Sequence, residues 1–196
     1  MDLFYGICQG LGLALSIGIG GALVALFASM MASLEAGFDP DGTDFDFITA
    51  TWYLVVLFVV IVLAILARGR EAARLPIIAL LAATGAIAFA ASLAEEGETF
   101  WPGLILGAVA TGFTALIAGQ VLDGAIERAR GSGPDEAAAS AANTLIIGFA
   151  FTGMLLAALA LYLPPVSIAV ALFLLALFAG RRRRAGEKYE GLRILR

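Results

Sequence analysis

The sequence predicts an all-α integral membrane protein, a bundle of six transmembrane helices. Of its residues, 61% are hydrophobic and 14% are charged, whereas soluble domains have roughly 45–50% and 25%. Charged residues are also absent from four long intervals, 51–67, 75–93, 101–122 and 137–180. Because about 20 apolar residues cross a hydrocarbon core of roughly 30 Å, these intervals have the length of membrane spans, and the last can hold two.

The helices follow from where charge and turn chemistry interrupt the apolar sequence. Turn sequences occur at 39–42 and 131–134, charged stops occur at 68–70 and 95–98, and Pro164 and Pro165 separate the last two helices. The predicted spans lie near 3–33, 49–67, 75–93, 101–122, 138–163 and 165–180. Residues 123–130 extend the fourth helix into water, and a basic tail, 181–196, follows the membrane domain 1–180.

The first apolar stretch, 3–33, is too long for one simple span. As a single helix it would measure about 46 Å, well beyond the hydrocarbon core, so it must tilt, protrude or break. The sequence GIGG at 18–21 lies near its middle, and glycine-interrupted spans can expose backbone groups to a substrate or ion. Close packing against another helix explains the same glycines, so both interpretations stay open.

Charge asymmetry orients the predicted bundle. Segments 35–48 and 94–100 carry acidic residues and no Lys or Arg, and all 12 basic residues fall on the other side. The positive-inside rule places that basic side, and with six spans both termini, in the cytoplasm. The expected location is a bacterial cytoplasmic membrane. No removable signal peptide is expected, because no basic region precedes the first apolar stretch.

Small residues at four-residue spacing predict which helices pack closely, since close approach in lipid depends on them. The packing positions so predicted are Gly6, Gly10, Gly103, Gly107, Gly119 and Gly148. They favour an inner group of the first, fourth and fifth helices, with the second and sixth toward lipid and the third between. Because the first and fourth helices head two groups of three, the pattern is also compatible with two inverted three-helix halves.

The polar residues inside the spans are neutral. No ionisable side chain lies at the predicted midplane, histidine is absent, and the one cysteine, Cys8, lies in the first span, so no catalytic residue and no cofactor are predicted. A substrate path, if one exists, is predicted to run along Ser16, Gly18, Thr111 and Thr152. An inner polar cluster toward the cytoplasmic end is predicted from Gln9, Gln120 and Asn143. Hydrogen bonding between helices is the simpler explanation for these side chains.

Two charged segments are candidate binding sites. Four carboxylates in the outer loop, Asp39, Asp41, Asp44 and Asp46, are weak candidates for calcium because they lack the EF-hand spacing, and a solvated acidic loop is the simpler interpretation. The run Arg181, Arg182, Arg183 and Arg184 could bind anionic lipid, although anchoring the topology explains it more simply. No nucleic-acid binding is expected, because no basic face carries base-stacking aromatics.

Three short stretches carry a resemblance to a known family: ICQGLGLA at 7–14, DGTDF at 41–45 and KYEGLRILR at 188–196. Together they resemble the bacterial membrane proteins grouped as domain of unknown function 4126. The resemblance covers the whole chain and implies no activity. The family pattern has an arginine after the glycine of the first helix, and the stretch 18–21 has none, so no role of that arginine carries over.

These observations predict a carrier or channel-like protein for a small or lipidic solute. The alternative is a non-catalytic subunit or scaffold of a membrane complex, in which the glycine stripes serve only to pack helices. An intramembrane enzyme is disfavoured by the missing histidine and buried acids. The lipid bilayer is the expected partner, and a homo-oligomer or a second membrane protein stays open.

Overall fold

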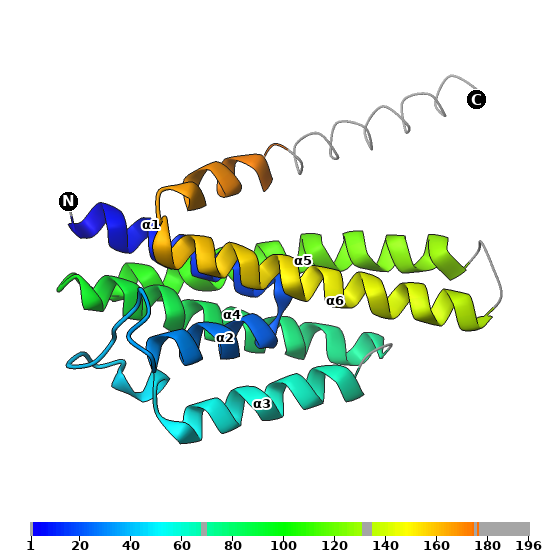
Figure 1. Cartoon of the computed structure of the whole chain (residues 1–196), viewed down its shortest axis with the longest axis horizontal. Helices are drawn as coiled ribbons and strands as arrows, with labels where there is room; N and C mark the ends of the chain where they lie inside the picture. The colour runs from blue at the N-terminus through cyan, green and yellow to red at the C-terminus, as the bar shows by residue number, and fades with distance from the viewer. Residues whose placement is uncertain (1, 68–69, 131–134, 175, 177–196) are drawn as a thin grey trace.

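The computed structural model describes residues 2–67, 70–130, 135–174 and 176, and in these ranges every regular element is helical. The helices are α1 (Asp2–Gly20), α2 (Ala22–Ala32), the short 3-10 helix η1 (Asp46–Ile48), α3 (Thr51–Leu66), α4 (Glu71–Glu95), α5 (Trp101–Arg130) and α6 (Asp135–Tyr162). Residues 166–174 are also helical. Within the described ranges, α1, α4, α5 and α6 are long and apolar enough to cross a membrane. Figure 1 shows these helices running roughly along one axis.

The stretch 3–33, predicted as one span in which a break stayed open, is two helices. α1 ends at Gly20, and Gly21 has a φ of +75° and a ψ of −160°, a conformation that is essentially restricted to glycine. The chain then reverses, and α2 returns toward the end of the bundle where α1 begins (Figure 1). The long stretch does not simply tilt or protrude. It breaks at Gly21 and forms a helical hairpin.

The hairpin changes which end of the bundle holds the beginning of α1. The Gln9 side-chain amide donates to the Gly37 carbonyl, and the Ser92 hydroxyl lies 3.0 Å from the Gly6 carbonyl oxygen. The beginning of α1 therefore lies beside segments 35–48 and 96–100, which we call the acidic end. The opposite end, where α4 begins at Glu71 and α5 ends at Arg130, we call the basic end. The sequence predicts residue 3 at the basic end, opposite to the structure.

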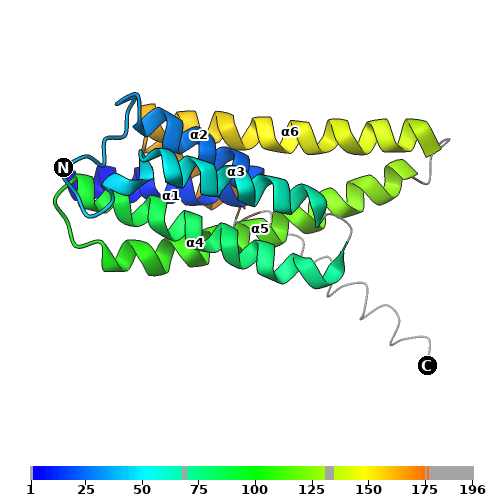
Figure 2. The same ribbon diagram turned by 90° about the horizontal axis from the view of Figure 1, so that it is seen from below.

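α1 occupies the centre of the bundle. It packs against α4, α5 and α6, and α4 also packs along α5 (Figures 1 and 2). α3 packs mainly on α2, and its bulky side chains, such as Phe58 and Val55, are exposed. The second predicted helix thus faces outward, as the sequence indicates. The third predicted helix, now α4, is as much a part of the centre as α5 is.

The two three-helix halves differ, so an inverted repeat has no support in this fold. α5 is one continuous helix of 30 residues, whereas its counterpart at the head of the first half is the broken pair α1 and α2. The last predicted helix, 165–180, corresponds to the helical residues 166–174, and its remainder, except for residue 176, lies outside the described residues. The basic tail 181–196 lies outside them as well.

Candidate functional site

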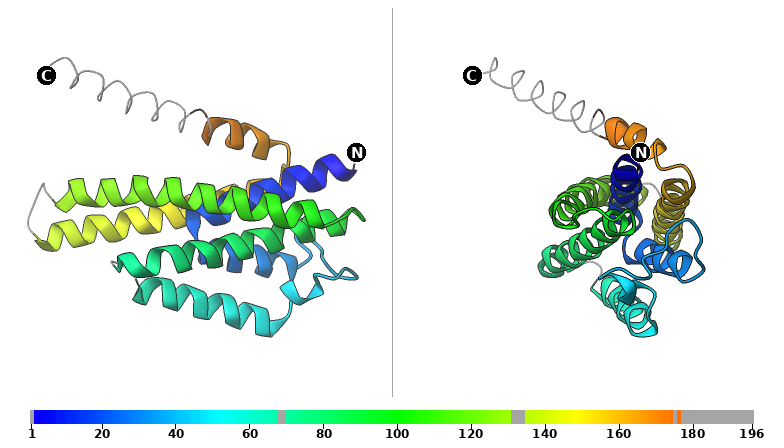
Figure 3. Two further views of the ribbon diagram at one scale, coloured as in Figure 1. Left: turned by 180° about the vertical axis from the view of Figure 1, so that it is seen from behind. Right: turned by 90° about the vertical axis from the view of Figure 1, so that its left-hand side faces the viewer.

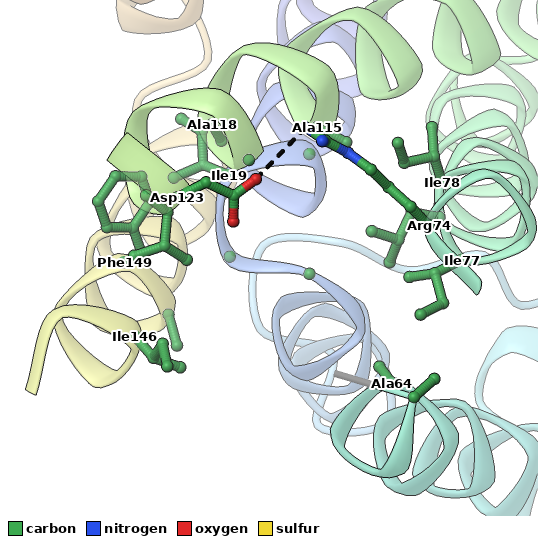
Figure 4. A pocket seen from close by; sticks show the side chains of 18 of the residues that line it. Ile19, Ala64, Arg74, Ile77, Ile78, Ala115, Ala118, Asp123, Ile146 and Phe149 are labelled. Atoms are coloured by element: carbon green, nitrogen blue, oxygen red, sulfur yellow. Dashed lines mark ion pairs between the residues drawn. The ribbon is translucent and has the colours of Figure 1, made fainter. Parts of the chain in front are cut away.

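A cavity of about 510 Å³ lies between the tip of the α1–α2 hairpin and the basic end. Its walls come from five helices, and Figure 4 shows side chains from α3, α4, α5 and α6 around the hairpin tip. The lining residues are Gly18, Ile19, Gly20 and Gly21; Ala64 and Ala67; Arg70, Arg74, Ile77, Ile78 and Leu81; Ala115, Ala118, Gly119, Leu122 and Asp123; and Ile146, Phe149 and Ala150. Ligand pockets typically enclose roughly 300–1,000 Å³, so this cavity, hereafter the vestibule, has the size of a binding site.

The vestibule exists because α2 is short. With 11 residues, α2 extends about 16 Å at 1.5 Å per residue, close to half of a hydrocarbon core. Seen along the bundle axis, α2 fills the space between α6 and α3 (Figure 3). From Ala22 toward the basic end, none of the described helices takes the place of α2, and Ala64 of α3 and Ile146 of α6 line the cavity there.

The ceiling of the vestibule is backbone as well as side chain. Gly21 N–H donates to the Ile17 carbonyl at 2.8 Å, and Val24 N–H donates to the Gly21 carbonyl at 3.1 Å. The last carbonyls of α1 and the first amides of α2 have no partner inside their own helices. Because carbonyls point toward the end of a helix and amides toward its start, both sets point toward the basic end. The ceiling therefore offers acceptors and donors close together.

Charged side chains lie only at the mouth of the vestibule, among its lining residues. The Arg74 guanidinium lies 3.5 Å from the Asp123 carboxylate, and this ion pair joins α4 to α5 (Figure 4). Both side chains are well exposed, at 46% and 66%, so the pair is screened by water and contributes little stability. Arg70, the residue that precedes α4, adds a second guanidinium. The mouth has a net charge of one positive unit.

Above the hairpin tip the bundle is closely packed. The Thr111 hydroxyl, fully buried, donates to the Ala14 carbonyl at 2.8 Å and joins α5 to α1. A Cβ added to Gly18 would lie 2.7 Å from the Thr114 side chain and 2.8 Å from the Thr111 carbonyl oxygen. Phe89 is 1% exposed and contacts Gly10. The vestibule therefore ends at the hairpin and does not continue as a cavity past Thr111.

The four residues predicted to line a substrate path are separated in the structure. Gly18 lines the vestibule, and Thr111 of α5 contacts Gly18. Ser16 is fully buried, and its hydroxyl donates to the Leu13 carbonyl of its own helix. Thr152 is exposed on α6 and donates to the Gly148 carbonyl. Gly18 thus reaches the cavity, Ser16 and Thr111 lie in the packed half, and Thr152 lies on the outer surface.

The predicted packing glycines mostly face α4 rather than one another. Gly6 and Gly10 of α1 contact Ser92 and Phe89, and Gly103 and Gly107 of α5 contact Ala90 and the Gly85 carbonyl. Gly119 faces the vestibule, 3.4 Å from Arg74 when a Cβ is added, and Gly148 has open space within 4 Å among the described residues.

Four further glycines make close contacts that the sequence pattern does not single out. Gly20 of α1 meets Gly153 of α6 backbone to backbone, Gly85 of α4 contacts Thr111, and Gly12 contacts Ser167 and Ala160. Gly85 is the one glycine in the charge-free interval 75–93. A single glycine in an otherwise bulkier span is a signal of close helix contact, and here it marks α4 as a central helix.

The predicted inner polar cluster does not form. Gln9 lies near the acidic end, where its amide donates to Gly37 and its side-chain oxygen lies 2.9 Å from the Ser92 hydroxyl. Gln120 and Asn143 lie on α5 and α6, away from Gln9. The reversal of the chain at Gly21 is the cause, because it moves the first part of α1 to the other end of the bundle.

The acidic loop is organised by hydrogen bonds to its own backbone. The Asp39 carboxylate accepts from Asp41 N–H at 3.1 Å, and the Asp46 carboxylate accepts from Thr43 N–H at 3.0 Å. Among the described residues, Asp44 and its neighbours form no group of three or more carboxylate, thiol or imidazole side chains placed to hold a metal ion. Cys8 is buried in α1. Of the four candidates, Asp39 and Asp46 therefore stabilise turns of the loop.

Two contacts fix the loop at the acidic end, one to α4 and one to Phe100 just before α5. The Glu95 carboxylate accepts from Asp39 N–H at 3.0 Å through one oxygen. Its second oxygen is buried and has no hydrogen-bond partner among the described residues. Phe45 of the loop also meets Phe100 edge-on at 5.5 Å between ring centroids. The loop therefore covers the acidic end.

Arg74, Asp123 and the apolar wall around Ile77 and Phe149 are the features of the vestibule that sequence reasoning misses. From the sequence, the two charged residues are only boundary residues of helices. Their spacing in the chain gives no sign that α4 and α5 bring them together. A break near Gly20 is among the alternatives that the sequence leaves open, but the reversal of direction that creates the vestibule is not.

The fold and composition define an all-helical protein with four helices, among those described, that can cross a membrane, which indicates a membrane protein. Comparison of the chain with protein-family models, with curated proteins and with solved structures finds no match.

Proposed function

We propose that the protein is a carrier or channel-like membrane protein whose solute enters the vestibule from the basic end. The observation that carries the proposal is the short helix α2, which follows the turn at Gly21, beside a cavity of about 510 Å³. Helices that end inside the membrane bring unpaired backbone groups to a site at mid-depth, an arrangement common in transporters. Irregular backbone at that depth is tolerated where it lines a cavity, as Gly21 does here.

The proposed orientation places the basic end in the cytoplasm of a bacterial cell. Arg70, Arg74, Arg128 and Arg130 lie at that end, and the positive-inside rule favours it. In this orientation the beginning of α1 and the acidic loop face outside. The packed half around Thr111 separates the vestibule from the outer side, so the state described is closed outward and open inward. A carrier fits this arrangement better than an open channel does.

Water access to the vestibule tests the proposal. In a Cys8→Ser background, cysteine at Ala118 should react with a membrane-impermeant thiol reagent applied from the basic side. Matched cysteines at Ala90, which is fully buried on α4, and at Val109, which is 64% exposed on the outer face of α5, should stay protected. Protection of Ala118 from both sides would refute a water-filled vestibule.

The second candidate function is a non-catalytic subunit or scaffold. The observation that favours it is the tight junction around Phe89, where Gly10 and Gly107 admit the ring between α1 and α5, because such packing needs no solute. In that case Ala118 would be protected and the chain would copurify with a membrane partner in stoichiometric amount. Labelling of Ala118 in the chain purified alone would argue against this candidate.

A further inference from the structure

The side of the vestibule between α3 and α6 indicates which kind of molecule could occupy it. α2 separates α6 from α3 in the acidic half (Figure 3), and it begins only at Ala22. In the basic half, Ile146 of α6 and Ala64 of α3 face the hollow from opposite sides (Figure 4). In a bilayer, acyl chains of the leaflet at the basic end would border this gap.

The wall chemistry suits a hydrocarbon chain. Apart from the glycines of the hairpin tip and of α5 and the three charged residues at the mouth, every lining residue is apolar, including Ile77, Leu81, Ile146 and Phe149. A small hydrophilic solute would find no side-chain hydrogen-bond partner on these walls. Ligand sites pair apolar walls with a few convergent polar groups, and here the polar groups are the backbone at the hairpin tip and the three charged side chains toward the basic end.

The charge at the mouth selects the sign of the head group. Among the lining residues, Arg70 and Arg74 are positive and Asp123 is the one negative side chain, and it is paired with Arg74. The Arg70 guanidinium is left for an external anion, beside Arg74. A guanidinium binds a phosphate or carboxylate through two parallel hydrogen bonds. The arginines lie at the depth where the head groups of that leaflet lie in the proposed orientation.

From these observations we propose that the vestibule binds an acidic lipid of the basic-end leaflet, with its acyl chain entering between α3 and α6 and its anionic head group held by Arg70 and Arg74. This inference rests on the proposed function, because it names the substrate class of the same cavity. The apolar wall favours a hydrocarbon chain, the gap between α3 and α6 favours entry from the bilayer, and the two arginines favour an anionic head group. Together they fit an amphiphile with one negative head.

The test compares lipids that differ only in head group. The full chain, purified in detergent with Arg181, Arg182, Arg183 and Arg184 changed to Gln to remove binding at the tail, is titrated with dioleoyl phosphatidylglycerol and with dioleoyl phosphatidylcholine, and binding is read by native mass spectrometry. Phosphatidylglycerol should bind more tightly. Arg70→Gln and Arg74→Gln should each weaken its binding about fivefold and leave phosphatidylcholine unchanged.

A pair of variants on α5 separates the cavity from the general surface. Ala118→Phe fills the vestibule without changing charge and should abolish the preference for phosphatidylglycerol. Val109→Phe, on the exposed side of the same helix, should retain it. The thermal unfolding midpoint of each variant is compared with that of the parent to confirm that the variant is folded. If Ala118→Phe is unstable, Ala150→Phe, which fills the same space from α6, replaces it.

Three results would overturn the inference: equal binding of the two lipids, binding unchanged in the filled variant, or displacement of phosphatidylglycerol by glycerol 3-phosphate, which would identify a free anion as the ligand. Labelling of cysteine at Ala118 separates this failure from that of the proposed function. If Ala118 labels and the lipids do not differ, the vestibule is real and its occupant is not an acidic lipid. If Ala118 is protected in the detergent-purified chain before lipid is added, both proposals fail, because no added acyl chain is then present to cover it.

Discussion

The acidic and basic halves of the bundle use glycine in opposite ways. In the acidic half, a Cβ added to Gly10 would lie 2.1 Å from the Phe89 ring, and one added to Gly107 would lie 2.6 Å from the Gly85 carbonyl oxygen. In the basic half, Gly124 has open space within 4 Å among the described residues, and Gly119 approaches only the flexible end of Arg74. The same residue type on one helix, α5, thus closes a junction at one end and leaves room at the other.

The difference follows from the length of the hairpin. Where α1 and α2 are both present, they fill the space among the other helices, and small residues allow the backbones to approach. Beyond Gly21, toward the basic end, neither α1 nor α2 is present, and the surrounding helices line the vestibule. A glycine in the basic half, such as Gly124, has no neighbouring helix close enough to contact it. A small-residue stripe therefore indicates close packing only where a second helix reaches it.

The largest expected effect distinguishes the two ends of α5. Gly107→Ala should lower the free energy of unfolding by about 3 kcal/mol, the upper part of the range for overpacking, because the nearest atoms are the Gly85 and Ala86 backbone, which cannot rotate away. Gly124→Ala should instead stabilise the helix by about 0.5–1 kcal/mol. Thermal unfolding in detergent compares them. Equal destabilisation by both changes would remove the contrast between the halves.

The next effect concerns the reversal itself. Gly21→Ala should cost about 2 kcal/mol, within the range for a residue forced into a glycine-only conformation, although the added methyl has open space around it among the described residues. Gly148→Ala, where space is equally open and the backbone is helical, serves as the matched control and should not destabilise. A Gly21 variant as stable as the parent would mean that residues 3–33 do not turn at this position.

The smallest effect compares two threonines that the sequence pattern does not distinguish. Thr111→Val removes a buried hydrogen bond between α5 and α1 and should cost about 1 kcal/mol. Thr152→Val removes an exposed bond within α6 and should change the unfolding free energy by no more than about 0.5 kcal/mol. Both variants are measured by the shift of the unfolding midpoint. A larger loss at Thr152 than at Thr111 would place the packed interior elsewhere.

Sequence reasoning predicts most of the helices because charge and apolar length act locally. The intervals 75–93 and 101–122 fall inside α4 and α5, and the break region 18–21 contains the turn at Gly21. What the sequence does not supply is direction. A glycine pair is equally compatible with a kink, a packing contact or a reversal, and only the tertiary contacts of α1 decide among them.

The site is harder to predict for the same reason. Gly18 does line the cavity. Thr152 also belongs to a stripe of small residues, but it is exposed on the outer surface. Arg74 and Asp123 are 49 positions apart in the chain and meet only because α4 and α5 are antiparallel. The vestibule lies where α2 does not reach, and no pattern of residues in the sequence marks a place that a helix leaves empty.

The most direct test of the account is the distance between the beginning of α1 and the acidic end. In a Cys8→Ser background, spin labels at Leu3 and Thr99, which line one small cavity together, are measured by pulsed electron paramagnetic resonance. Labels at Trp101 and Arg128, near opposite ends of α5, provide an internal ruler of about 40 Å. The account predicts that the Leu3–Thr99 distance is much shorter than this ruler. A separation of roughly 30 Å or more, the thickness of the hydrocarbon core, would show that α1 begins at the basic end and would contradict the hairpin.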